Sequence, residues 1–252
     1  MPFTTDELAG VLWVLAGGTP QPAHERIATA LQRALTLRIF PEDRLPSERW
    51  LADAFGVSRI TIRGALAFLR EQGMVRSGGS RRAGTVSNPR TTDAHGNPAR
   101  LLEDAGRDIA DILDFRSLVE PVAARLAARF ADDELVTRLR LSVDGLRTSP
   151  DPTAFRRADS AFHLALARAT RNQRLLEAVL VTRAELLAWR DLIPMPDDVA
   201  ENLVEHERIA DAVEARDEDR AAAEMLAHLR GTLTSFELHV QALGANEAVT
   251  GR

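Results

Sequence analysis

The chain has 252 residues, of which 45% are hydrophobic, so it can build either one large core or two ordinary domains. It contains no cysteine, which excludes disulfide bonds, thiolate zinc sites and cysteine nucleophiles. No run of about 18 apolar residues is present, and the stretch Leu8–Ala16 is too short and too acidic at its start for a secretory signal. We therefore expect a cytoplasmic protein that does not enter a membrane.

The net charge of −5 is unevenly distributed along the chain. The segment from Arg38 to Arg82 contains nine arginines against five acidic residues, a net charge of +4, which leaves −9 for the remainder. A basic segment joined to an acidic body indicates two domains with different partners, although chance clustering would give the same totals.

The basic segment carries the start and stop signals of three helices. Apolar residues repeat at every fourth position within residues 24–39, which predicts the first helix. Ser47 is a suitable N-cap for a second, short helix, and Gly56 can end it in the left-handed conformation. Ser58 then caps a third helix, predicted over residues 59–72.

A glycine-rich stretch, GMVRSGGSRRAGTVS, follows the third helix and predicts a short β-hairpin with two arginines at its tip. Three helices with a tight turn between the last two, followed by a hairpin, predict a winged helix-turn-helix. The expected fold class is mainly α, with this domain followed by an all-α bundle. The predicted parts are an N-terminal extension to which we assign no function (1–22), the winged helix-turn-helix (23–87), a linker (88–100), a helical effector-binding and dimerisation domain (101–243) and a C-terminal tail (244–252).

The C-terminal half is expected to be all-helical, because helical periodicity dominates there and clusters of glycine and β-branched residues become scarce. Acidic pairs, prolines and one asparagine mark the breaks between helices. The predicted helices span about 106–130, 132–147, 151–170, 172–192, 196–215 and 217–243.

Polar side chains crowd the start of the predicted third helix. Arginine at that position can donate two hydrogen bonds to guanine in the major groove, and threonine can contact a phosphate or a thymine methyl. Arg49 opens the preceding helix, where N-terminal amides and a guanidinium together suit a phosphate. A lone arginine is usually a solvated surface residue, but the basic helix start, the tight turn and the basic hairpin together favour DNA binding. The residues concerned at the helix start are Ser58, Arg59, Thr61 and Arg63.

Three histidines and one aspartate in the acidic half have spacing that suits a metal site. Asp159 and His163 lie four residues apart and share a helix face, whereas His206 and His228 lie on two other predicted helices. One carboxylate and three imidazoles could enclose a divalent ion and leave positions for water or a ligand. Histidines on amphipathic helices are more often packed structural residues, so spacing alone leaves both interpretations open.

The stretch RLPSERWLADAFGVSRITIRGALAFLREQGMV resembles the DNA-binding domain of the GntR family of bacterial transcription regulators, over residues 24–87. The resemblance implies that the arginine of LPSER and the polar residues of SRITIR contact operator DNA. It also implies that the wing reaches the DNA through Arg82 and Gly84. The chain departs from common members at Ile60 and Gly64, where Thr and Glu are frequent, and in the wing sequence RRAGT, where QGRGT is frequent. The implied operator contacts of the helices are Arg49, Ser58, Arg59, Thr61 and Arg63.

Four further stretches, beginning DILDFRSLVE, ADSAFHLALA, EHERIADAVE and AAAEMLAHL, resemble the FCD effector domain of the FadR subfamily, over residues 101–240. The resemblance implies a divalent metal ion, zinc before nickel, manganese or magnesium, that helps to hold a small carboxylate effector. It also implies that Arg116 faces the effector cavity, although a surface pair with Glu120 is an alternative for that arginine. The implied metal ligands are Asp159, His163, His206 and His228.

These features predict a ligand-responsive transcription regulator, expected to be a repressor, that senses an organic or sugar acid. One reading head contacts only half a palindromic site in double-stranded DNA, so we expect a homodimer. An architectural DNA-binding protein with a structural metal and no effector is the main alternative. We do not expect an enzyme, because a metal-activated water would need a general base and no motif supplies one once Asp159 is used as a ligand.

Overall fold

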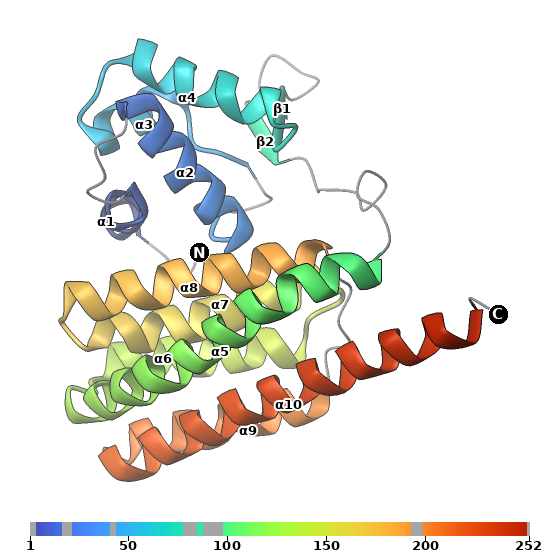
Figure 1. Ribbon diagram of the computed structural model, residues 1–252. Coiled ribbons are helices and arrows are strands. Elements are labelled where there is room, and N and C mark those ends of the chain that lie inside the picture. The colour runs from blue at the N-terminus through green and yellow to red at the C-terminus, as the bar shows by residue number, and fades with distance from the viewer. Residues whose placement is uncertain are drawn as a thin grey trace. The chain divides into compact units, whose positions relative to one another are not determined.

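The computed structural model describes residues 4–16, 22–40, 44–77, 85–87, 98–192 and 199–250. The chain forms two compact units, Met1–Thr91 and Thr92–Arg252, which are described separately below. Figure 1 shows helices in both units and the two short strands in the first. In the part of the chain that the structure describes, no helix is long and apolar enough to cross a membrane.

The first unit is a winged helix-turn-helix preceded by an additional helix. Its strands β1 and β2 pair antiparallel, with Val75 opposite Ser87, and the backbone N–H of Leu45 donates to the Thr85 carbonyl at 3.0 Å. The predicted mainly helical fold with an N-terminal winged helix-turn-helix is confirmed. The elements are α1 (Thr5–Ala16), α2 (Ala23–Thr36), α3 (Glu48–Phe55), α4 (Arg59–Glu71), β1 (Val75–Ser77) and β2 (Thr85–Ser87).

The predicted caps fix the turn between α3 and α4. The Ser47 side chain accepts a hydrogen bond from the Trp50 amide, and the Ser58 side chain accepts one from the Thr61 amide, both at 3.2 Å. Gly56 ends α3 with φ at +61°, a left-handed conformation that costs glycine little. Ile62, Ala65, Leu66 and Leu69 form the buried face of α4. The opposite face of α4 is therefore free to carry polar side chains.

Helix α1 lies within residues 1–22, to which we assigned no function from the sequence, and it packs against the rest of the first unit. Leu12 and Leu15 are fully buried, and Val11 nearly so. The Trp13 indole donates a hydrogen bond to the carbonyl of Ala54 in α3, at 2.8 Å. Because the last carbonyls of a helix lack partners within it, this bond supports the end of α3 next to the turn. Helix α1 is thus an integral part of the unit.

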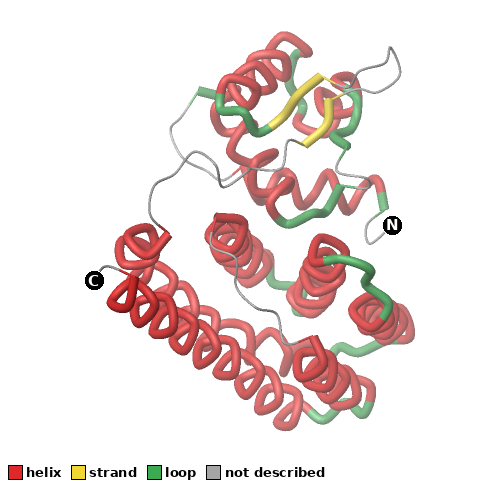
Figure 2. The backbone as a smooth tube through the Cα atoms, turned by 90° about the vertical axis from the view of Figure 1, so that its right-hand side faces the viewer, coloured by secondary structure: helices red, strands yellow, loops and turns green. Residues whose placement is uncertain are grey.

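The second unit consists of six helices among the residues described. Figure 1 shows them running alongside one another, and Figure 2, turned by 90°, shows several of them end-on. Helix α5 begins at Pro98, inside the predicted linker, because proline is tolerated in the first turn of a helix; α10 continues to Thr250, through the predicted tail. The helices are α5 (Pro98–Arg129), α6 (Asp133–Arg147), α7 (Pro152–Ala169), α8 (Gln173–Leu192), α9 (Val199–Glu214) and α10 (Glu218–Thr250).

The main core of this unit is built from α5, α6, α7, α9 and α10. Phe162 and Leu166 of α7 are buried in it together with Ile209 of α9 and Leu229 of α10. The same sides of α7, α9 and α10 carry the histidines singled out in the sequence. The core therefore sets the distances between side chains that lie far apart along the chain.

The packing of α1 can be tested by replacing a buried leucine in it. Leu12→Ala removes a fully buried side chain and is expected to lower the free energy of unfolding of the first unit by about 2–5 kcal/mol. Gly10→Ala is the matched control, since an added Cβ meets nothing within 4 Å and is expected to stabilise α1 by roughly 0.5–1 kcal/mol. Denaturant unfolding followed by tryptophan fluorescence measures both. Equal stability of Leu12→Ala and the unaltered chain would show that α1 does not pack as described.

Candidate metal centre and nucleic-acid interface

The first turns of α4 present two exposed arginines. The side chains of Arg59 and Arg63 are 60% and 62% exposed. Arg63 donates to Glu48 at 2.9 Å, and Arg59 lies 3.6 Å from the same carboxylate. Exposed ion pairs contribute little to stability, so a phosphate or a base edge can replace Glu48 at small cost. This helix end can therefore bind a polyanion.

The remaining predicted DNA contacts are only partly described. Arg49 and Ser58 are exposed, and Thr61 is half-buried. The hydroxyls of Ser58 and Thr61 lie 2.9 Å apart, and Ser58 also caps α4, so it has a structural role with or without DNA. The two predicted wing residues, Arg82 and Gly84, lie outside the described residues.

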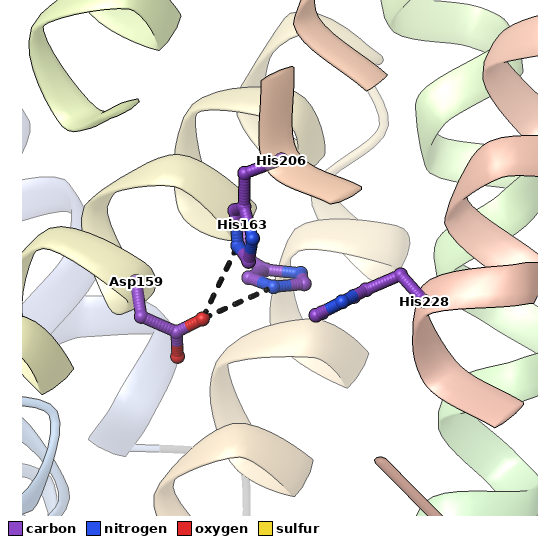
Figure 3. A group of neighbouring side chains, drawn as sticks. All are labelled: Asp159, His163, His206 and His228. Carbon is purple, nitrogen blue, oxygen red and sulfur yellow. Dashed lines mark ion pairs between the residues drawn. The ribbon is translucent and has the colours of Figure 1, made fainter. Parts of the chain in front are cut away.

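The four predicted metal ligands come together in the interior of the second unit. Helix α7 supplies Asp159 and His163, α9 supplies His206 and α10 supplies His228. All four are buried, and one ligand atom from each lies within 4.8 Å of the others (Figure 3). Oδ1 of Asp159 lies 3.3 Å from Nε2 of His206 and 3.6 Å from Nε2 of His163. Ligands around a tetrahedral zinc ion lie roughly 3.3–3.4 Å apart, so these atoms can share one ion.

Each imidazole in the cluster is oriented through its Nδ1 atom. Nδ1 of His163 pairs with the Glu120 carboxylate, and Nδ1 of His206 donates to the Asn202 carbonyl at 2.7 Å. Nδ1 of His228 donates to Glu205 at 2.8 Å. A donating Nδ1 leaves Nε2 with a free lone pair, which is the arrangement that metal-binding histidines usually have.

The Nε2 atoms of His163 and His206 are buried without a hydrogen-bond partner among the described residues. With Nδ1 protonated, each of these atoms is an acceptor, and the nearest charged oxygen, on Asp159, is an acceptor too. Acceptors that face one another in a protein interior need a cation between them. The cluster can therefore hold a divalent metal ion.

Charges around the cluster keep its groups in the forms that metal binding requires. Burial alone raises the pKa of Asp159, but Arg183 and the two imidazoles hold that pKa well below its ordinary value. Burial and repulsion by His206 and His163 hold the pKa of His228 well below the ordinary value for histidine. The carboxylate is thus charged and His228 neutral at pH 7.

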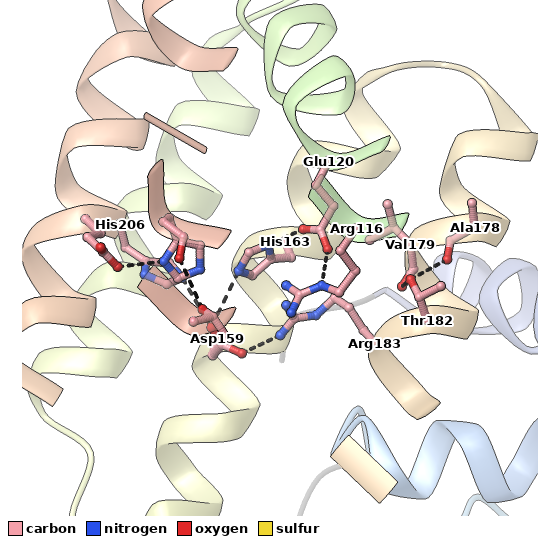
Figure 4. Close-up of polar contacts among 12 residues, drawn as sticks. Arg116, Glu120, Asp159, His163, Ala178, Val179, Thr182, Arg183 and His206 are labelled. Carbon is pink, nitrogen blue, oxygen red and sulfur yellow. Dashed lines mark hydrogen bonds and ion pairs between the residues drawn. The ribbon is translucent and has the colours of Figure 1, made fainter. Parts of the chain in front are cut away.

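Two buried arginines lie beside the cluster, as Figure 4 shows. Arg116 is 2% exposed and donates to Glu120 at 2.6 Å, so the alternative pair between these residues forms, but in the interior rather than on the surface. Arg183 of α8 pairs with Asp159, and its Nε atom is buried with no hydrogen-bond partner in the described part of the chain. Each arginine therefore contacts a carboxylate that in turn contacts the histidines.

Sequence reasoning did not find the residues that orient the ligands. Glu120 appeared only as a partner for Arg116, and Asn202 and Glu205 were not considered. The one sequence signal is the adjacency of Glu205 and His206, which carries no information about a bond to His228 on another helix. Burial raises the pKa of Glu120, but Arg116, His163 and Arg183 hold it well below its ordinary value, so Glu120 is a charged acceptor.

An exposed basic helix in a winged helix-turn-helix, joined to a helical unit with a buried histidine cluster, defines the class of two-domain, DNA-binding transcription regulators. Residues 23–85 match the bacterial regulatory proteins of the gntR family, and residues 111–231 match the FCD domain. The chain belongs to the GntR family, and its two domains fit the FadR-type architecture.

Two relatives match most of the chain. It is 31% identical to the HTH-type transcriptional repressor NanR of Cronobacter sakazakii, over 84% of this chain and 85% of that one. It is 30% identical to the putative HTH-type transcriptional regulator RmpR of Mycobacterium gastri, over 82% and 76%. The solved structure of E. coli McbR/YncC has the same fold, with a TM-score of 0.54 at 15% identity, over 87% and 99%. NanR and RmpR are both named as regulators of transcription, not as enzymes.

The orienting role of Glu205 leads to a test of metal affinity. Glu205→Ala removes the acceptor for Nδ1 of His228 and is expected to weaken zinc binding by about 10- to 100-fold. Glu207→Ala is the matched control, because Glu207 lies on the same helix but pairs with Arg147 at the surface. Competition with a chromophoric chelator measures both affinities. An equal loss in the two variants would contradict the orienting role.

Proposed function

We propose that this chain is a cytoplasmic, ligand-responsive repressor that binds a palindromic operator as a homodimer and senses a small carboxylate through a bound metal ion. The observation that carries the proposal is the set of buried acceptor atoms facing one another in the FCD domain. A core that holds no metal would not need unpaired imidazole nitrogens, because a hydrogen-bonded or apolar core is more stable.

The DNA-reading role is assigned to the exposed start of α4. Arg59 and Arg63 contact base edges in the major groove, and Thr61 contacts a phosphate or a thymine methyl. Arg49, at the start of α3, contacts the phosphate backbone together with the helix amides. Arg82 and Gly84 contact the DNA from the wing. The exposure of both α4 arginines supports this assignment.

The metal ion is held by Asp159, His163, His206 and His228, and the three imidazoles favour zinc over magnesium or manganese. An ion held there would attract an anionic oxygen atom as a further ligand, by expanding its coordination beyond the four protein ligands. The chain's own residues orient the ligands and exclude bulk water, since all four are buried.

The effector is a small organic or sugar acid whose carboxylate is shared between the metal and a buried arginine. Arg116 and Arg183 are the candidates, because both are buried and both contact the carboxylates next to the cluster. Arg183 has a free Nε donor in its described surroundings, which an effector oxygen can accept. Effector binding shifts the equilibrium between two arrangements of the helical domain. The size of the shift is set by the difference between the effector's affinities for the two arrangements.

The reading helix can be tested by one substitution. Arg59→Ala removes a base contact and is expected to weaken binding to the chain's own promoter DNA by roughly 5- to 150-fold, corresponding to about 1–3 kcal/mol. Arg70→Ala is the control, since Arg70 is also exposed but lies in the last turn of α4. Electrophoretic mobility shift at fixed salt measures both. An unchanged operator affinity for Arg59→Ala, with the fold intact by circular dichroism, would remove α4 as the recognition helix.

The sensing role can be tested on DNA release. His228→Ala removes a metal ligand and is expected to abolish release of the operator by carboxylic acids while operator binding without effector persists. His239→Ala, on the same helix but outside the cluster, is expected to respond as the unaltered chain does. A panel of organic and sugar acids is titrated against the protein–DNA complex. If no acid releases DNA from the unaltered, zinc-loaded protein, the sensing role is contradicted and the architectural alternative is favoured.

A further inference from the structure

One face of α5 is exposed and carries charge in a regular order. Leu118 at its centre is 72% exposed, which is unusual for a leucine in the middle of a long helix. Phe115 and Val122 flank it and are 42% and 45% exposed. These three side chains share one face, because residues three and four apart are neighbours on a helix. The apolar patch therefore lies outside the core of this unit.

Charged residues flank the patch symmetrically along the helix. Asp111 lies seven residues before Leu118 and Arg125 lies seven residues after it, and both are exposed. Seven residues are close to two full turns, so all three lie nearly in line on the same face. The face is thus acidic towards the start of α5, apolar at the centre and basic towards the end.

We propose that this face of α5 binds the same face of a second copy of the chain, with the two helices antiparallel and the two-fold axis at Leu118. The occupant follows from the order of the charges. In an antiparallel pair, Asp111 of each copy lies opposite Arg125 of the other, about 10 Å along the helix from the axis. A parallel pair would instead place like charges opposite one another, which is unfavourable.

Asp111 and Arg125 both remain available to pair with a second copy of the chain. Asp111 makes no ion pair with another described residue, and Arg125 pairs with Asp219, whose side chain is 85% exposed. Arg125 itself is 45% exposed, so a second carboxylate can approach it. A two-fold contact of this kind is self-complementary and closes at the dimer.

The same helix carries Arg116 and Glu120 on its opposite, buried face, next to the histidine cluster. A displacement of α5 caused by an effector at Arg116 would therefore be transmitted to the dimer contact. This inference rests on the proposed homodimer. It assigns that dimer a contact surface and gives a route by which effector binding can change the contact.

Sedimentation equilibrium of the full-length, zinc-loaded protein tests the patch. Leu118→Glu places two carboxylates on the two-fold axis and is expected to raise the dimer dissociation constant by at least about tenfold. Leu141→Glu is the matched control, because Leu141 is 66% exposed but lies on α6. Circular dichroism and zinc content establish that each variant is folded. If Leu118→Glu does not fold, the charge variants below carry the test.

The charge order is tested with two single variants. Asp111→Arg and Arg125→Asp each place like charges together in their own homodimers, so each alone is expected to dimerise at least about fivefold more weakly. Mixing the two variants creates a heterodimer in which both opposing pairs are again Arg with Asp, and this mixture is expected to recover the original affinity. A parallel dimer already places like charges opposite one another, so neither single variant would weaken it. Weakening of each variant alone, followed by recovery on mixing, is therefore expected only of the antiparallel arrangement.

The outcomes separate this inference from the proposed function. If Leu118→Glu leaves the dimer dissociation constant unchanged, or if the two charge variants do not recover their affinity on mixing, the α5 contact is overturned and the homodimer stays in place. A chain that is monomeric at micromolar concentration, with and without operator DNA, would overturn both.

Discussion

The helical unit depends on one constraint, which is that acceptor atoms face each other in its interior. Nε2 of His163 and of His206 lie within 3.6 Å of the Asp159 carboxylate, and neither nitrogen has a hydrogen-bond partner among the described residues. An unsatisfied buried polar atom costs about 1–3 kcal/mol, so a chain that keeps several of them in one place needs a compensating cation. Helices α7, α9 and α10 supply the four ligand side chains, and α5, α8 and α9 supply the groups that fix their charge and orientation.

Contacts between neighbouring side chains connect the buried arginines, the proposed metal ligands and helix α5. Arg116 and Glu120 link α5 to His163, and Arg183 links α8 to Asp159. An anion that draws either arginine away from its carboxylate changes the support of a metal ligand as well. In the proposed regulator, effector binding, metal binding and the position of α5 are therefore coupled by contacts between neighbouring side chains. Such coupling must be reciprocal, so the metal also raises the affinity for the effector.

The sequence predicted what depends on local patterns. Ser47, Gly56 and Ser58 set the turn of the reading head through their own backbone preferences, and each behaves as predicted. The four proposed ligands were found because Asp159 and His163 share a helix face and the other two lie in recognisable motifs. Glu120 and Glu205 could not be assigned, because their bonds reach 43 and 23 residues along the chain and depend on how whole helices pack. Helix α1 was missed because its apolar residues were interpreted only as a failed signal sequence, although they cover the first unit.

X-ray absorption spectroscopy at the zinc edge of the full-length, zinc-loaded protein tests the central claim most directly. The account predicts one ion per chain with three imidazole nitrogens at about 2.0–2.1 Å and the remaining positions filled by oxygen. It also predicts that His206→Ala removes one imidazole from that shell. A shell made of oxygen alone, or an imidazole count that His206→Ala does not change, would contradict the claim that this cluster is the metal site.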